Sequence, residues 1–311
     1  MLLKQILFRL LQLIITMWAV VTVVFFLLRV SGDPIDMLFA GDPRPEAVQE
    51  AEMLRHDYGL DLPLPVQYVH YLVNVATLNF GNSISLKRPV LTLIGEELPH
   101  TLRLTLSAFV IAYTLAVPIG VLIAVYKNTP LDYAVQTLSM AGVSIPSFWL
   151  GIMLILLFAV QLEWLPALGL GDGNPRYLVL PVMTIVIPRV AFMSRFVRGT
   201  MLDVLNEDYL RTARSKGLRE RVVIFRHGLR NAFIPILTVA GVQLGYLVSG
   251  SVIIERVFGL PGIGDLLVDS ISTRDFPVTQ AMVLIIAFSI VLMNLLVDIL
   301  YVFVDPRVRA N

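Results

Sequence analysis

Few residues in this chain could perform chemistry. There is no cysteine, which excludes disulfides, thiolate metal sites and a cysteine nucleophile. Residues 262–265 spell GIGD, a match to the GxGD pattern around the catalytic aspartate of intramembrane aspartyl proteases. We expect no proteolysis, because Asp265 follows Pro261 in a polar turn. Asp298 is the acid that lies deep in a predicted span, and it is better explained as a helix-end polar pair with Asn294. Neither HExxH nor GxSxG occurs, so an enzyme is not indicated.

The most polar segment, residues 198–231, has a charge order that predicts a docking helix. Acidic residues at 207–208 precede several basic residues, and Gly217 follows them. This order suits the dipole of a helix over 207–216, and glycine can adopt the left-handed conformation that ends a helix. We expect a second short helix over 219–229. Because this segment is so polar and basic, we expect it to bind another protein. The alternative, a loop that only sets topology and contacts anionic lipid, explains the charges but neither their order nor the glycine.

Membrane-spanning helices must position these residues. Of the 311 residues, 57% are hydrophobic and 15% are charged, and the mean hydropathy is +0.78, whereas soluble domains are about 45–50% apolar and about 25% charged. One span needs about 20 mostly apolar residues. Such windows lie at 10–28, 103–127, 132–163, 177–197, 230–255 and 275–298. The predicted fold class is an all-α integral membrane protein with six transmembrane helices.

The distribution of charge predicts the side that each loop faces. Six crossings place both termini on one side, and more than half of the 24 Lys and Arg residues lie in the segments on that side. Acidic residues concentrate in the opposite segment, between 33 and 97. By the positive-inside rule, both termini are expected in the cytoplasm. The outer segment, 30–100, is expected to form a small cap of short helices and turns.

Polar residues inside the predicted spans are candidates for a translocation path. An arginine at the depth of Arg189 costs roughly 2.5–3.5 kcal/mol, so it either extends to the inner headgroups or faces a water-filled path. In the second case it would bind an anionic part of a substrate or pair with Asp298. Other residues that could line the path are Gln243, Tyr246, Ser249 and Ser144. Isolated polar residues in membrane helices also bond to neighbouring helices, which is the alternative for these four.

Several motifs resemble those of a known family. The run EDYLRTARSKGL at 207–218, followed by HGLRNAFIP, resembles the cytoplasmic coupling loop of binding-protein-dependent ABC importer permeases, in the form found in the dipeptide, oligopeptide, glutathione and nickel permease family. The resemblance covers nearly the whole chain. It includes GDP at 32–34, YGLDLPLPVQY at 58–68, FGNS at 80–83, RPV at 88–90, PHTLRLT at 99–105, ERVFGLPGIGDLLVDSI at 255–271, RDFPV at 274–278, NLLVDILY at 294–301 and DPRVR at 305–309.

The resemblance implies a type I importer permease of the bacterial inner membrane. Residues 1–97 would form the first transmembrane helix and an extracytoplasmic region, and 98–304 the permease domain with its coupling loop at 198–231. The implied partners are a second, usually different permease chain, two ATPase subunits, an extracytoplasmic substrate-binding protein and the lipid bilayer, and no nucleic acid. The implied coupling residues are Asp208, Tyr209, Arg211, Ala213, Arg214, Lys216 and Gly217.

The resemblance also bears on cofactors and substrate. The chain has no GxxxxGK[ST] loop, so no cofactor is expected to bind to it, and ATP and Mg²⁺ are expected to act in the ATPase subunits. Family frequency favours di- or oligopeptides as substrates, and the same machinery importing nickel or glutathione is the alternative. A secondary transporter is the alternative of another class, but it would show inverted repeats and several charges at mid-membrane, and neither is evident.

Overall fold

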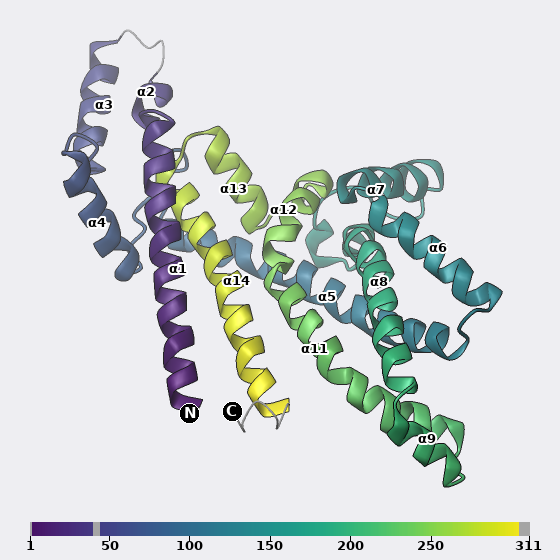
Figure 1. The fold of residues 1–311 in the computed structure, drawn as a ribbon. Coiled ribbons are helices and arrows are strands. Elements are labelled where there is room, and N and C mark those ends of the chain that lie inside the picture. The colour runs from purple at the N-terminus through teal and green to yellow at the C-terminus, as the bar shows by residue number, and fades with distance from the viewer. Residues whose placement is uncertain (1, 40–43, 305–311) are drawn as a thin grey trace.

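The computed structural model describes residues 2–39 and 44–304, and these ranges are helical apart from connecting turns and one isolated antiparallel bridge between Asn82 and Pro89 (Figure 1). The elements in chain order are α1 (Leu2–Val30), α2 (Pro34–Leu38), α3 (Pro45–Asp57), α4 (Leu64–Ala76), α5 (Val90–Val125), α6 (Pro130–Ser144), α7 (Ser147–Leu154), η1 (Ile155–Gln161), η2 (Gly171–Gly173), α8 (Arg176–Leu205), α9 (Asp208–Ser215), α10 (Glu220–Val222), η3 (Val223–Leu229), α11 (Arg230–Gly245), α12 (Leu247–Phe258), α13 (Ile263–Ser272) and α14 (Phe276–Val304). The all-α prediction is confirmed. The DPRVR motif at 305–309 lies outside the described residues.

Five stretches of the described chain are long and apolar enough to cross a membrane as single helices. They are α1, α5, α8, the stretch 220–245 that ends with α11, and α14. The remaining window, 132–163, forms α6 and then α7 with η1, and this pair is bent by 102°. Pro146 explains the bend, because proline disfavours a helical conformation in the preceding residue, and Ile145 is extended. The count reaches six only if the bent pair is one span.

Two predicted boundaries differ from the structure. The second short helix of the polar segment, predicted over 219–229, is not separate, because α10 and η3 continue into α11. The window 230–255 is not one helix, because α11 ends at Gly245 and α12 begins at Leu247. Hydropathy detects neither difference, since it reports how apolar a segment is and not where the helix axis continues or breaks.

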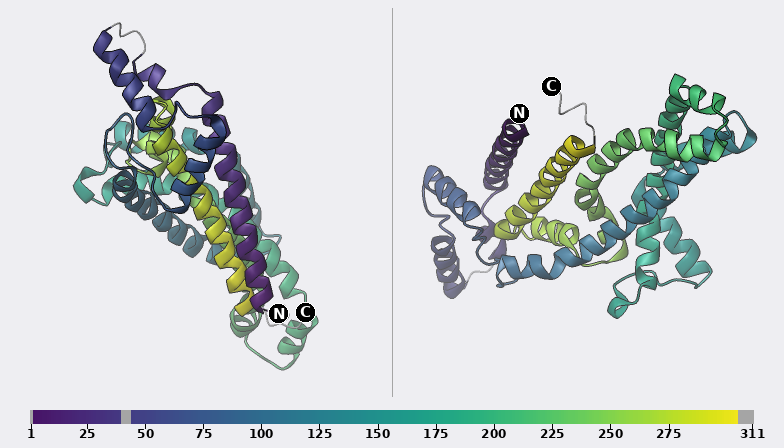
Figure 2. Two further views of the ribbon diagram at one scale, coloured as in Figure 1. Left: turned by 90° about the vertical axis from the view of Figure 1, so that its left-hand side faces the viewer. Right: turned by 90° about the horizontal axis from the view of Figure 1, so that it is seen from below.

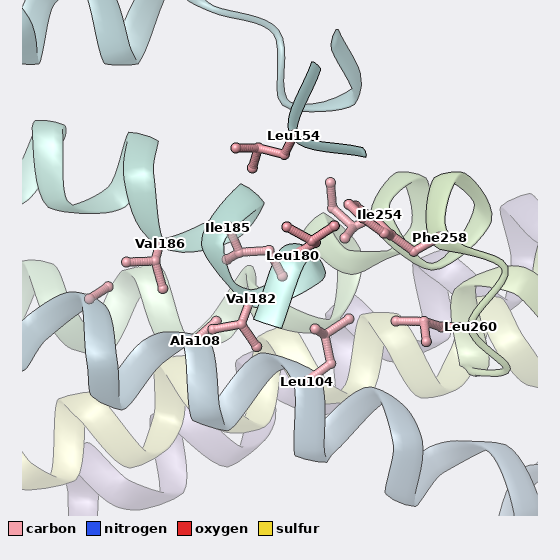
Figure 3. Packing of buried hydrophobic residues seen from close by; sticks show 11 residues of the cluster. Leu104, Ala108, Leu154, Leu180, Val182, Ile185, Val186, Ile254, Phe258 and Leu260 are labelled. Carbon is pink, nitrogen blue, oxygen red and sulfur yellow. The ribbon is translucent and has the colours of Figure 1, made fainter. Parts of the chain in front are cut away.

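The main core lies where α5, α7, α8 and α12 meet (Figure 3). Its buried side chains are contributed by all four helices: Leu104, Ala108, Ala112, Leu154, Leu180, Val182, Ile185, Val186, Ile254, Phe258 and, just after α12, Leu260. Farther along, α5 and α8 approach closely at Gly120, where a Cβ would lie 2.5 Å from the Cβ of Val197. Such close approach of small residues stabilises helix packing in lipid.

The two ends of the molecule differ in character. The start of α1 and the end of α14 lie side by side at the bottom of Figure 1, and α9 lies at the same end but well to the right, whereas α2, α3 and α4 lie toward the top. Helix α1 packs along α14, as the views of Figure 2 also show. We call residues 206–229 the hairpin and residues 31–89 the cap. The described residues of the cap form short helices and turns, as predicted, but the predicted segment 30–100 also includes residues 90–100, which belong to the long helix α5.

Candidate functional site

The hairpin is held together by its buried face. Leu210 and Ala213 of α9 pack against Val223 of η3, and both Leu210 and Val223 have no exposed surface. The opposite face of α9 is open, since the side chains of Asp208 and Arg211 are 95% and 73% exposed. An apolar inner face and a charged outer face leave α9 fixed to the molecule and free to bind another protein.

Three of the predicted coupling residues stabilise the hairpin itself. Arg214 pairs with Glu220 at 3.0 Å and so joins α9 to α10. The hydroxyl of Tyr209 accepts a hydrogen bond of 2.9 Å from Asn231 Nδ2 in the first turn of α11. Ala213 is buried against the hairpin interior. Lys216, in contrast, is exposed together with Asp208 and Arg211.

Gly217 ends α9 in the left-handed conformation that the sequence predicts. Its φ is +75°, and its N–H donates to the carbonyl of Arg214 at 2.9 Å. A Cβ at this position would meet no atom within 4 Å. Glycine is therefore favoured by the backbone conformation and not by crowding.

A buried ion pair joins α6 to α8 near the hairpin. Nε and Nη2 of Arg198 donate to the two carboxylate oxygens of Asp132 at 2.7 and 2.6 Å, and Asp132 has no exposed surface. The carboxylate also accepts from the N–H of Asn128 and the amide of Gln136. This two-bond geometry is the strong form of an ion pair. This ion pair was not predicted, although Thr129 followed three residues later by an acid is a helix-start pattern that positions Asp132 at the beginning of α6.

Arg189 points into the interior between helices. Its Nη1 lies 3.5 Å from Oε1 of Gln243 on α11, which is a weak contact. Both residues line a cavity of about 280 Å³ together with Tyr113 of α5, Ser147 of α7 and Thr184 of α8. The hypothesis that Arg189 pairs with Asp298 concerns a side chain outside those that the structure describes.

The other predicted path residues lie elsewhere. The hydroxyl of Ser144 donates to the carbonyl of Met140 in its own helix, and that of Ser249 donates to the carbonyl of Tyr246. Tyr246 is 52% exposed at the break between α11 and α12. Among the five path candidates, the structure therefore brings only Gln243 to Arg189.

The GIGD segment encloses a buried carboxylate, that of Glu255, whose role was not predicted from the sequence. Oε2 of Glu255, which has no exposed surface, accepts from the N–H groups of Gly264 and Asp265 at 2.8 and 3.2 Å. Oε1 accepts from the hydroxyls of Thr101 at 2.7 Å and Ser251 at 2.9 Å. Because these groups belong to α5, α12 and α13, one carboxylate ties three helices together. The sequence signal was the paired glycines, since a Cβ at 262 would lie 2.5 Å from the Glu255 carboxyl carbon.

Asp265 itself forms an ion pair and has no catalytic setting. Its carboxylate accepts from Arg256 Nη1 at 2.8 Å, and Asp269 accepts from the same nitrogen at 2.8 Å. These carboxylates, with the Asp265 hydrogen bond as the largest cause, raise the pKa of Arg256 above its ordinary value. The GxGD match thus belongs to a structural corner between α12 and α13.

The fold and these sites define the class of protein. Helices of the apolar spans surround a small cavity that Arg189 and Gln243 line, and α8, which contributes Arg189, runs directly into a hairpin with a charged outer face. The chain is a helical membrane permease with a charged hairpin at one end.

Comparison with known proteins gives the family. Residues 116–310 match the model of the binding-protein-dependent transport system inner membrane component, and residues 2–105 match the model of the N-terminal part of such membrane components. The chain therefore belongs to this family of ABC importer permeases and is a multi-pass protein of the inner membrane. A permease of this family works with ATPase and substrate-binding partners.

Full-length relatives are similar throughout. The glutathione transport system permease protein GsiC of Pectobacterium atrosepticum is 44% identical over 302 residues, which is 97% of each chain. GsiC of Escherichia coli K12 is 43% identical over 97% of each chain, and GsiC of Salmonella typhi is 43% identical over 99% of each. A solved structure of the MetNI methionine ABC transporter in an inward facing conformation matches with a TM-score of 0.57 and 19% identity, over 69% of this chain and 97% of that chain. That likeness supports the fold alone.

Proposed function

We propose that this chain is one of two permease subunits that import glutathione, or a peptide of similar size, with two ATPase subunits and an extracytoplasmic binding protein. The observation that carries the proposal is the 43–44% identity, over at least 97% of the chain, to permeases named for glutathione transport. The sequence favoured di- or oligopeptides with glutathione as an alternative, and the names of the relatives support that alternative more than the first choice. Other peptides and nickel remain the alternatives that an uptake assay must compare.

The hairpin is the proposed ATPase contact. Its outer face presents Asp208, Arg211 and Lys216, while Leu210 and Ala213 fix it from inside. The start of α1 and the end of α14 lie at the same end of the molecule as α9, so contact of the hairpin with a cytoplasmic ATPase would put these two helix ends on the cytoplasmic side. ATP and Mg²⁺ then act in the partner subunits.

Helix α8 connects the proposed contact to the cavity. It is one helix from Arg189 to Leu205, a span of about 24 Å at about 1.5 Å per residue. The ion pair between Arg198 and Asp132 extends this rigid connection to α6. A displacement of the hairpin when the ATPase closes would move the cavity wall as a rigid body, which is how such interfaces transmit motion.

Arg189 supplies the chemistry that fits the proposed substrate. Glutathione carries a carboxylate at each end, and a guanidinium binds carboxylates through two parallel hydrogen bonds. The contact of Arg189 with Gln243 is weak at 3.5 Å and leaves most of its donors available. Removal of water from a cavity between apolar helices strengthens such an ion pair.

Uptake of labelled glutathione, dipeptide and nickel tests the proposal in cells that express the chain with its co-encoded partners and lack other importers for these solutes. We expect ATP-dependent uptake of glutathione. Arg189→Ala should lower this uptake at least about tenfold at unchanged protein level, since a hydrogen bond to a charged group is removed. Ser144→Ala is the matched control, because its hydroxyl bonds within α6, and it should leave uptake unchanged.

Two results would contradict the proposal. Uptake of dipeptide or nickel without glutathione would show that the substrate is wrong. Wild-type uptake and substrate preference in Arg189→Ala would show that this residue does not bind the solute.

A further inference from the structure

The cap holds a second cavity, of about 560 Å³, that import through the Arg189 cavity does not use. It lies between the cap and the outer ends of α1 and α14, and its lining includes Arg29, Tyr71, Asn74 and Gln280. Asp57 is the one carboxylate among its described lining residues. A cavity of this size and polarity suits a small polar molecule.

The guanidinium of Arg29 lies at this cavity with only part of its hydrogen-bond donors paired. Its Nε donates to Oε1 of Gln67 at 2.7 Å, and its guanidinium lies over the rings of Phe25 and Phe276 at 4.8 and 5.4 Å. Neither terminal nitrogen makes a hydrogen bond to any described residue, and Nη1 is shielded from solvent. The acid nearest in sequence, Asp33, is engaged by Arg55 at 2.8 Å.

Tyr71 adds a second donor without a partner. Its hydroxyl is buried and makes no hydrogen bond to a described residue, while its ring stacks on Phe25 at 5.6 Å. Burial raises the pKa of this phenol, so the group stays protonated and able to donate. Buried donors of native proteins are nearly always paired, so two unpaired donors at one cavity point to an acceptor that is not part of the chain.

We propose that the cap cavity binds the carboxylate of a small zwitterionic molecule, with Arg29 and Tyr71 as donors. A carboxylate can accept from both groups at once, and its charge matches that of the guanidinium. Asp57, on the lining of the same cavity, provides a negative charge for an ammonium group. The occupant is thus of amino-acid or dipeptide size, and the site is separate from the Arg189 cavity whichever solute is imported.

Thermal unfolding of the full-length chain in lipid nanodiscs tests the site with three probes. Glycylglycine should raise the unfolding temperature in a saturable way. Glycylglycinamide, which lacks the carboxylate, and inorganic phosphate, which represents a lipid headgroup, should not.

Variants locate the binding. Tyr71→Phe keeps the ring and removes only the unpartnered hydroxyl, and it should weaken glycylglycine binding about tenfold. Tyr68→Phe is the matched control on the same helix, because its hydroxyl bonds Thr22 at 2.7 Å and does not line the cavity, and it should bind normally. Arg29→Gln should abolish binding, and Arg189→Ala should retain it.

Three outcomes would overturn the proposal. They are no stabilisation by glycylglycine, equal affinity in wild type and Tyr71→Phe, and stabilisation by phosphate as strong as that by glycylglycine. Loss of binding in Arg189→Ala with normal binding in Arg29→Gln would place the ligand in the other cavity and would contradict the site equally.

Discussion

Substitution of Gly217 by valine tests whether the end of α9 transmits motion. Gly217 has a φ of +75°, and a Cβ added there would meet no atom within 4 Å, so the cost of valine that can be assigned is that of its backbone conformation. A left-handed conformation costs an L-residue about 1–2 kcal/mol, and a β-branched residue adopts it least readily. That energy disfavours the observed conformation at the end of α9 by a factor of about 5–30.

We expect Gly217→Val to lower solute uptake and solute-stimulated ATP hydrolysis several-fold, while membrane insertion stays normal. The measurement is uptake and ATPase activity of the reconstituted complex, together with the amount of ATPase that copurifies with the chain. Gly217→Asn should be close to wild type, because asparagine tolerates the left-handed conformation.

Gly173 offers a matched control elsewhere in the chain. Its φ is +85° and its Cβ position is also open, but it lies in η2, away from the hairpin. Gly173→Val therefore carries a similar backbone cost and should leave coupling unchanged. If Gly217→Val imports at the wild-type rate with ATPase bound, the hairpin end does not transmit motion and the reasoning is wrong.

Two further substitutions test the buried polar contacts. Asp132→Ala leaves Arg198 partly buried without its partner and should destabilise the protein by about 3 kcal/mol, seen as a lower unfolding temperature; Arg198→Ala in the same chain should recover part of the loss, and an unchanged temperature in the single variant would mean that the pair does not contribute. Glu255→Gln replaces one carboxylate oxygen by an NH₂ group, which then faces two groups that also donate and can no longer accept from them. This should lower the free energy of unfolding by about 2–3 kcal/mol. Its effect should exceed that of Glu220→Gln on the exposed pair with Arg214, and equal effects would argue against the buried network.

Much of the candidate site could be predicted from local sequence. Gly217 and the acid-to-base order of the preceding residues predicted both α9 and its stop, because helix dipole and left-handed caps depend on neighbours within a few residues. The same local rules could not separate Arg214, which bonds within the hairpin, from Arg211, which is exposed. Nor could they show that Gln243, and not Ser144, lies beside Arg189.

The sequence by itself determined that this chain crosses a membrane several times and where α9, the first helix of the polar hairpin, begins and ends. Both follow from hydropathy and capping, which act over one helix at a time. Only the tertiary structure decided the 102° bend between α6 and α7, the contact of Glu255 with Thr101 across 154 positions, and the position of Arg29 and Tyr71 at one cavity. Such contacts depend on how whole helices pack in space, and the periodicity of one segment does not indicate which other segment packs against it.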